Sequence, residues 1–201
     1  MFYEPASRDR KLLPRDPFKA LVAPRPIGWI STMSRAGEIN LAPYSFFNAF
    51  SGAPPLVGFS SEGPKDSATF AEESGEFVWN MATFELREAM NASSASLPRG
   101  ENEFDFARLD MAPCRIVKAP RVAASPCSLE CRVTEIFRLK NLEGEAVGNI
   151  LTLGQVVGVH LDERFVKDGR FDLAAAKTIM RCGYAADYAV VDALFQLERP
   201  K

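Results

Sequence analysis

The sequence predicts a mainly β protein, built as an antiparallel barrel with a few short helices around it. Short apolar stretches rich in β-branched and aromatic residues follow one another along the chain, separated by turns that contain glycine or proline. The chain lacks the regular alternation of strand and helix that a doubly wound parallel sheet requires. It also lacks a G-x-G-x-x-G segment after a strand, which argues against a Rossmann nucleotide site.

The first half of the chain is expected to form strands joined by tight turns. The expected strands are residues 27–33, 40–50, 56–60 and 77–81, and a short helix is expected over 65–74. A polar turn at 34–38 should join the first two strands into a hairpin. Residues 1–18 are rich in charge and proline and are interpreted as an arm that lies over the body.

The second half begins with a helical pattern and then alternates again. Residues 83–95 predict a helix with Thr83 as its N-cap, because acidic residues occupy its early turns. Residues 128–139 and 149–161 predict two strands, and Glu143 and Gly144 form the turn between them. A last short helix is expected over 173–180, before an aromatic tail. No repeat or linker divides the chain, so residues 1–201 are interpreted as one domain.

The composition indicates a protein that works in the cytoplasm. The chain has 201 residues, of which 47% are apolar, enough for one well-buried core. Its formal net charge of -2 gives no bulk attraction for nucleic acid or for an anionic membrane. It contains no apolar run near the roughly 20 residues that span a bilayer, and its charged N-terminus is unlike a secretory signal. Four cysteines in such a chain fit a reducing compartment.

The residue types for hydrolysis and for metal binding are scarce. The chain has one histidine, His160, at the end of an apolar strand, where a packed or capping role is more usual than a catalytic one. Cys127 and Cys131 are four residues apart, but only His160 could complete a zinc site with a nitrogen ligand. The cysteines are therefore expected to be buried thiols, and neither a metal site nor a catalytic side chain is predicted. A cofactor that carries the reaction itself would suit such a chain.

The candidate binding site lies between residues 25 and 67, where small hydroxyl residues recur at strand ends beside aromatic ones. A terminal phosphate needs a helix N-terminus, hydroxyl donors and a cation, which Ser60, Ser61, Lys65 and Ser67 could supply. A flat ring needs an apolar slot and polar backbone groups, which the strand ends near 30–32 and 45–48 could supply. The residues alone leave an alternative open: the aromatic residues are core, the serines belong to turns, and Lys65 is solvated.

Three segments resemble the signature of the flavin reductase-like FMN-binding family. They are Arg25-Pro-Ile-Gly-Trp-Ile-Ser-Thr32, Asn40-Leu-Ala-Pro-Tyr-Ser-Phe-Phe-Asn48 and Lys65-Asp-Ser67. The resemblance continues in order through residues 75–80, 119–126, 129–131, 154–160 and 181–184. It is closest to flavoredoxin and to the flavin reductase components of two-component monooxygenases. Ser67 stands where the family usually has threonine, and Cys182 where an apolar or small residue is expected.

The resemblance implies an FMN-binding split β-barrel of Greek-key type that forms a homodimer with FMN, rather than FAD, at each subunit interface. It implies that the isoalloxazine ring is lined by Trp29, Ile30, Ser31, Thr32, Ser45, Phe46, Phe47 and Asn48. It implies that the phosphate is held by Ser60, Ser61, Lys65, Asp66 and Ser67. Because Asp66 repels phosphate, its expected role is to cap the helix or to orient Lys65. His160 and Arg181 are expected near the flavin or the nicotinamide, contributed by the partner subunit.

The activity implied is reduction of flavin by NADH or NADPH, with hydride transfer to N5 and onward delivery of electrons to a partner monooxygenase or another acceptor. The alternative is a flavoredoxin-like electron carrier that binds FMN without oxidising NAD(P)H. Two further alternatives are a split barrel without cofactor and an oxidase of a small substrate like the pyridoxamine phosphate oxidases. The phosphate-binding residues resemble the reductase pattern more closely than the oxidase pattern.

Overall fold

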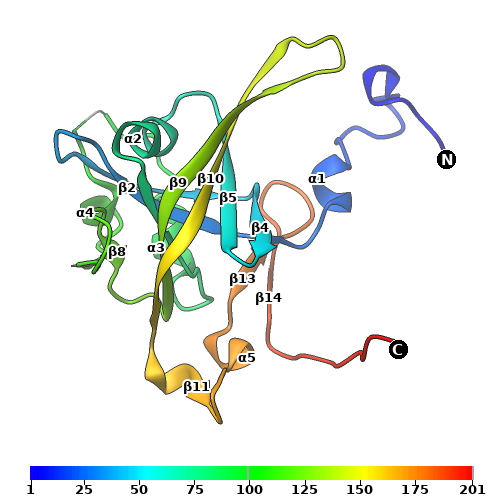
Figure 1. The fold of residues 1–201 in the computed structure, drawn as a ribbon. Coiled ribbons are helices and arrows are strands. Elements are labelled where there is room, and N and C mark those ends of the chain that lie inside the picture. Colours follow the sequence, from blue (N-terminus) through cyan, green and yellow to red (C-terminus); the bar gives the residue numbers. More distant parts are fainter. Residues whose placement is uncertain (99, 201) are drawn as a thin grey trace.

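A seven-stranded antiparallel sheet forms the body of the protein, in a computed structural model that describes residues 1–98 and 100–200. Its strands in spatial order are β3 (Ile39–Tyr44), β2 (Gly28–Met33), β6 (Glu76–Asn80), β9 (Cys127–Lys140), β10 (Ala146–Leu161), β5 (Pro55–Glu62) and β4 (Phe47–Gly52). β3 and β4 lie at opposite ends of this order, yet only Ser45 and Phe46 separate them in the chain. The sheet must therefore curl until its two edges meet, which gives the barrel (Figure 1).

Short elements surround the barrel. The helices are α1 (Phe18–Leu21), α2 (Asp66–Ser74), α3 (Arg87–Ala92), α4 (Glu103–Phe106) and α5 (Leu173–Ala176), with 3-10 turns η1 (Pro5–Ser7) and η2 (Glu163–Phe165). A small three-stranded sheet joins β1 (Arg25–Pro26), β13 (Ile179–Arg181) and β14 (Tyr188–Val190). Two further strand pairs are β7 (Met111–Ala112) with β8 (Arg121–Val122), and β11 (Val166–Lys167) with β12 (Arg170–Phe171). Among the described helices, none has the length and hydropathy to span a membrane.

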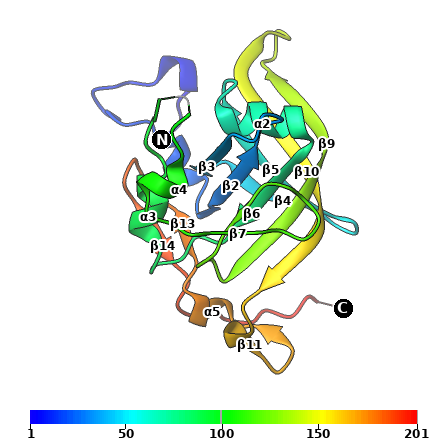
Figure 2. The same cartoon turned by 90° about the vertical axis from the view of Figure 1, so that its left-hand side faces the viewer.

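Apolar side chains pack on both faces of the sheet. On the inner face, Phe59 and Phe77 pack edge to face with ring centroids 5.4 Å apart, together with residues from α2. On the outer face, Trp29 packs with Met90 of α3 and Phe104 of α4. Because side chains of a strand alternate between faces, β2 contributes to both clusters. The segment that contains β7 crosses the outer face of the sheet (Figure 2).

The strand expected over residues 40–50 is divided into β3 and β4. β3 pairs with β2, which confirms the predicted hairpin, whereas β4 pairs with β5. The break falls at Ser45 and Phe46, where the chain leaves one edge of the sheet and joins the other. The composition of the segment gives no sign of this break, because the pairing partners that cause it lie elsewhere in the chain.

The two later helices are shorter than expected. The helix expected over 83–95 is limited to α3, whose N-cap residue is Leu86. Thr83 pairs with Thr178 in a β-bridge, and its hydroxyl accepts a hydrogen bond from the Leu86 N–H at 3.4 Å. The helix expected over 173–180 ends at Ala176, where Lys177 adopts a left-handed conformation. The residues after it form β13, which pairs with β1 and β14. α4 was not expected; its N-cap Asn102 accepts a hydrogen bond from the Phe104 N–H.

Two segments extend from the barrel. β9 and β10 continue past the other strands as a long two-stranded ribbon, seen at the top of Figure 1. Instead of lying over the body, most of residues 1–18 run away from it, with Phe2 and Leu12 exposed (Figure 1). The guanidinium of Arg15 lies 5.8 Å from the centre of the Tyr184 ring and ties the arm to the barrel.

Candidate functional site

The Lys65-Asp66-Ser67 sequence lies at the N-terminus of α2, immediately after the turn that follows β5. Lys65 is the N-cap residue and Asp66 the first residue of the helix, and both side chains are exposed. The first turn of any helix leaves backbone N–H groups without intrahelical partners. Together with the helix dipole, these N–H groups and the Lys65 ammonium group make this end of α2 suited to an anion.

The Ser67 hydroxyl is buried and already has a partner. It donates a hydrogen bond to Oδ1 of Asn40 at 2.5 Å, and Nδ2 of Asn40 donates to the Glu103 carboxylate at 3.0 Å. The same carboxylate accepts a hydrogen bond from the Leu41 N–H at 3.0 Å. Burial raises the pKa of Glu103, although these hydrogen bonds oppose the shift. Ser67 would therefore have to exchange a partner before it could donate to a ligand.

The two serines at the end of β5 differ in their exposure. Ser61 is fully buried, and its hydroxyl donates to the Gly63 carbonyl at 2.9 Å. Ser60 is half-buried, and its hydroxyl oxygen lies 3.5 Å from Nδ2 of Asn149 on β10. Ser60 is therefore the more accessible of the two hydroxyl groups, and Ser61 fixes the turn that leads to Lys65.

A cavity of about 320 Å³ lies beside the N-terminus of α2. It brings Lys65, Asp66 and Ser67 together with the end of β3, where Tyr44 lies, and with the Glu103 carboxylate. The remaining wall is residues 93–97, a run of serines, alanine and leucine after α3. This wall could not be predicted from the sequence, because small polar residues are typical of many loops and carry no specific signal.

Residues 29–32 are part of the core. All four side chains are fully buried in β2, and the indole N–H of Trp29 donates to the Ser93 hydroxyl at 2.9 Å. The backbone of Trp29 is paired on one side with Pro43 and on the other with Asn80. In this chain, therefore, Trp29 serves to attach the wall of the α2 cavity to the sheet.

Residues 45–48 are more accessible. Phe46 and Asn48 are exposed, and the Phe46 ring has the charged ends of Lys19 and Arg25 about 5.8 and 5.9 Å from its centre. Phe47 stacks on Trp79 with ring centroids 5.7 Å apart and planes that differ by 1°. The segment thus presents an exposed aromatic surface on a rigid support.

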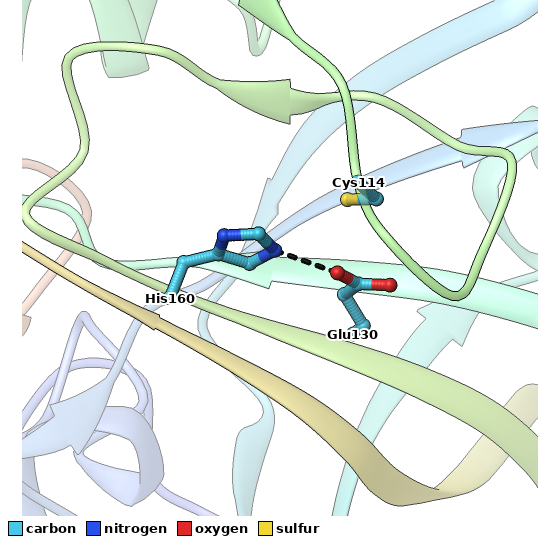
Figure 3. A group of neighbouring side chains, drawn as sticks. All are labelled: Cys114, Glu130 and His160. Atoms are coloured by element: carbon cyan, nitrogen blue, oxygen red, sulfur yellow. Dashed lines mark hydrogen bonds and ion pairs between the residues drawn. The ribbon is translucent and has the colours of Figure 1, made fainter.

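His160 lies in a different place, next to Glu130 and Cys114 (Figure 3). Its Nε2 atom is 2.6 Å from the Glu130 carboxylate, which is only 1% exposed. The same carboxylate accepts hydrogen bonds from the backbone N–H groups of Arg115, Ile116 and Val117 at 2.7 to 2.8 Å. Burial alone would raise the pKa of Glu130, but these hydrogen bonds outweigh it and lower the pKa to about 2.

The three side chains also have the composition of a metal site, but their chemistry fits a hydrogen-bonded cluster better. Both Glu130 oxygens already accept hydrogen bonds, and the Nε2 atom of His160 faces one of them. Burial raises the pKa of the Cys114 thiol to about 12, so without a metal the thiol is protonated. Cys127 and Cys131 are buried, as expected, and burial raises the pKa of both thiols.

Arg181 lies in a third place. It lines a cavity of about 410 Å³ between α3 and the small sheet that contains β13. One of its guanidinium nitrogens donates to the Tyr188 hydroxyl at 2.7 Å, another to the Ala185 carbonyl, and the group lies over the Tyr188 ring. Within one chain, the structure therefore does not bring Arg181 or His160 into the cavity beside Lys65.

Comparisons with known proteins agree with this architecture. Residues 21–173 match the model of the flavin reductase like domain family. The uncharacterized protein BH2278 of Halalkalibacterium halodurans is 36% identical over 184 residues, which cover 89% of this chain and 87% of the relative.

Two solved structures have the same fold. Component B of nitrilotriacetate monooxygenase from Bacillus cereus is 27% identical with a TM-score of 0.88, and the match covers 98% of both chains. A flavin reductase-type protein with a split barrel domain from Shewanella frigidimarina is 22% identical with a TM-score of 0.84, and the match covers both chains in full (100%). The predicted split β-barrel is thereby confirmed, and the chain belongs to the flavin reductase-like family.

Proposed function

We propose that this protein binds FMN and catalyses the reduction of flavin by NADH or NADPH, passing the electrons to an acceptor. The observation that carries the proposal is the cavity in which a lysine meets the N-terminus of α2. Membership of the flavin reductase-like family makes a flavin phosphate the natural anion for this site. Bound FMN would supply the ring that accepts a hydride, so the protein needs to bind and orient rather than to provide an acid or base.

The residues at α2 fit a phosphate group. The Lys65 ammonium would supply the charge, the first-turn N–H groups would supply directed hydrogen bonds, and the half-buried Ser60 would supply a hydroxyl. Ser61 and Ser67 have an indirect role at this site. Their hydroxyl groups fix the turn before α2 and the start of the helix. Asp66 would support the helix through its charge in the first turn.

We assign the ring to the exposed segment 45–48, because residues 29–32 are buried in the core. In this segment, the side chains of Phe46 and Asn48 are exposed. A ring placed there would be open to solvent on its other side, and a second copy of the chain would cover it. The proposal therefore includes a homodimer, in which His160 and Arg181 could reach the ring only from the partner.

The similarity to component B of nitrilotriacetate monooxygenase supports a partner oxygenase as the electron acceptor. Such an acceptor would receive its electrons from the reduced flavin. Binding of flavin and reaction with the nucleotide can be measured without the partner oxygenase.

The first test is the visible absorbance of the purified protein, followed by separate additions of NADH and NADPH without oxygen. The proposal expects oxidised-flavin bands that bleach with one of the two nucleotides. Bands that persist with both nucleotides would instead indicate an electron carrier of the flavoredoxin kind. A colourless protein that fails to bind added FMN would overturn the site itself.

The second test is titration of the apoprotein with FMN, followed by flavin fluorescence, in Lys65→Gln and in a control. We expect Lys65→Gln to weaken FMN binding by about tenfold to a hundredfold, because it removes a charge-assisted hydrogen bond to phosphate. Lys140→Gln removes the same charge from the end of β9 and should bind FMN as the wild type does. Equal weakening in both variants would show a bulk charge effect and contradict the assignment of Lys65.

A further inference from the structure

A second polar pocket, of about 490 Å³, lies where His160 and Glu130 meet. Its walls come from the segment that crosses the outer face of the sheet, from β9 and from the end of β10 (Figure 2). Two arginines, Arg115 and Arg121, line it together with Ser125. Within one chain it shares no lining residue with the cavity beside α2.

The two arginines of the pocket form no ion pair with its acidic groups. In the part of the chain that the structure describes, neither Arg115 nor Arg121 has a carboxylate within 4.0 Å. The Nε atom of Arg121 is buried and has no hydrogen-bond partner. A buried donor of this kind is expected to have a partner in the functional state.

The two acidic groups of the pocket already have other partners. The Glu130 carboxylate accepts hydrogen bonds from three backbone N–H groups and from His160. Asp162 forms an ion pair with Arg164 at 2.6 Å. Neither carboxylate is therefore paired with Arg121.

The orientation of His160 adds a further polar atom to the pocket. An ionised carboxylate only accepts hydrogen bonds, so the 2.6 Å contact with Glu130 requires a hydrogen on Nε2. Figure 3 shows the other ring nitrogen, Nδ1, turned away from Glu130. Within the described residues Nδ1 has no hydrogen-bond partner. Glu130 thus fixes the imidazole so that Nδ1 is the atom left to meet a ligand.

We propose that this pocket binds an anionic group, a phosphate or a carboxylate, through Arg121 and Nδ1 of His160, with Glu130 as the positioning residue for the imidazole. A planar guanidinium matches the two oxygens of such a group, and its buried Nε would gain the missing partner. In the imidazolium form of His160, Nδ1 would donate a hydrogen bond to the anion. Arg115, which is exposed at the rim, would add to the attraction.

The test uses the fact that the chain contains one histidine. A long-range ¹H–¹⁵N spectrum of the FMN-loaded, ¹⁵N-labelled protein reports the protonation of each ring nitrogen of His160 without further assignment. The ligands to add, one at a time, are inorganic phosphate, benzoate and NADP⁺. We expect each bound anion to shift the Nδ1 resonance while Nε2 keeps its proton.

Two arginine variants make the test specific. Arg121→Gln should weaken the binding of phosphate by about tenfold or more, because it removes a charge-assisted hydrogen bond. Arg138→Gln removes the same charge from the exposed ribbon and should leave the titration unchanged. In Glu130→Gln, the His160 ring should lose its preference for a proton on Nε2. If Glu130 contributed only to stability, this preference would be unchanged in the variant.

The same titrations identify the source of the anion. Stronger binding of NADP⁺ than of phosphate, lost in Arg121→Gln, would assign the group to the nucleotide, and stronger binding of benzoate would assign it to an organic acid. An Nδ1 resonance that none of the three ligands shifts would overturn the proposal. Because no turnover is measured, the result is independent of whether the protein reduces flavin.

Discussion

At the scale of single residues, Glu130 shows how a buried charge can be stabilised in this fold. Protein donors take the place of water around its carboxylate, which accepts four hydrogen bonds. Three come from consecutive backbone N–H groups and one comes from His160. The donors belong to residues 115–117, in the segment that covers the outer face of the sheet. One side chain therefore both anchors that segment and orients the only histidine of the chain.

The lowered pKa of Glu130 makes a prediction about stability and pH. The pKa falls from 4.5 to about 2, so the ionised group stabilises the fold at neutral pH. This contribution, about 3 kcal/mol, is complete above the ordinary pKa and is lost as the pH falls toward 2. We expect Glu130→Gln to lower the free energy of unfolding by this amount near neutral pH. The difference from the wild type should disappear in acid.

The measurement is denaturant unfolding of both proteins at several pH values. Glu72→Gln is a suitable control, because Glu72 forms an exposed ion pair with Arg138 on the ribbon, worth about 0–1 kcal/mol. A Glu130→Gln protein that is as stable as Glu72→Gln would show that the four hydrogen bonds contribute little. A destabilisation that stays constant into acid would assign the effect to packing rather than to charge.

At the scale of secondary-structure elements, close packing across the sheet depends on glycines in the central strands. A Cβ added to Gly154 of β10 would overlap the ring of Phe77 on β6, inside the barrel. A Cβ added to Gly28 would lie 2.8 Å from the Cβ of Phe47, where the two edges of the sheet approach. These positions require glycine because of the space available and not because of a positive φ angle.

We expect Gly154→Ala to destabilise the protein by about 1–3 kcal/mol, the usual cost of excess volume in a packed core. Gly52→Ala is the matched control, since a Cβ at Gly52 of β4 meets no atom within 4 Å and should change stability by less than about 0.5 kcal/mol. Thermal unfolding of the two variants measures the difference. Similar midpoints for both would mean that Phe77 moves aside at little cost.

The sequence predicted well those elements whose pattern is local. The strands 27–33, 77–81, 128–139 and 149–161 and the helix 65–74 all appear close to their expected bounds. The errors at 40–50, 83–95 and 173–180 have one cause, because in each case a partner distant in the chain decides the structure. Thr83, for example, pairs with Thr178 in a β-bridge, although the residues next to Thr83 in the sequence favour a helix start.

The candidate site was predictable to a similar extent. The segment around Lys65 could be located because a helix start has a local signature, and it does lie beside a cavity. The burial of Trp29 and the partners of Ser67 could not be predicted, since they depend on Ser93 and Asn40 from distant segments. Glu130 was missed as well, because a single acidic residue in a strand gives no sign of the backbone N–H groups around it.

At the scale of the whole molecule, three parts of the site that the family resemblance implies line three different cavities of a single chain: residues 65–67, His160 and Arg181. The same chain exposes several large apolar side chains near one edge of the barrel. They are Phe18 and Leu21 of α1, Phe46 at the break between β3 and β4, and Phe50 of β4. The Lys19 ammonium group of α1 lies 5.8 Å from the centre of the Phe46 ring. Clusters of exposed apolar residues commonly mark an interface, and a two-fold dimer is the commonest assembly.

We therefore predict that the protein is a dimer in which these residues are buried against the partner. Light scattering should give twice the chain mass of 22.2 kDa. Burial of each large apolar side chain contributes about 1.5–3 kcal/mol, so Leu21→Ser with Phe50→Ser should weaken the dimer by about a hundredfold or more. Because residues 45–48 adjoin this surface, the monomeric variant should also lose FMN more readily. Leu142→Ser, at the fully exposed tip of the ribbon, is the control and should remain dimeric. A wild-type protein that is monomeric yet retains FMN would show that one chain completes the flavin site and that His160 and Arg181 act elsewhere.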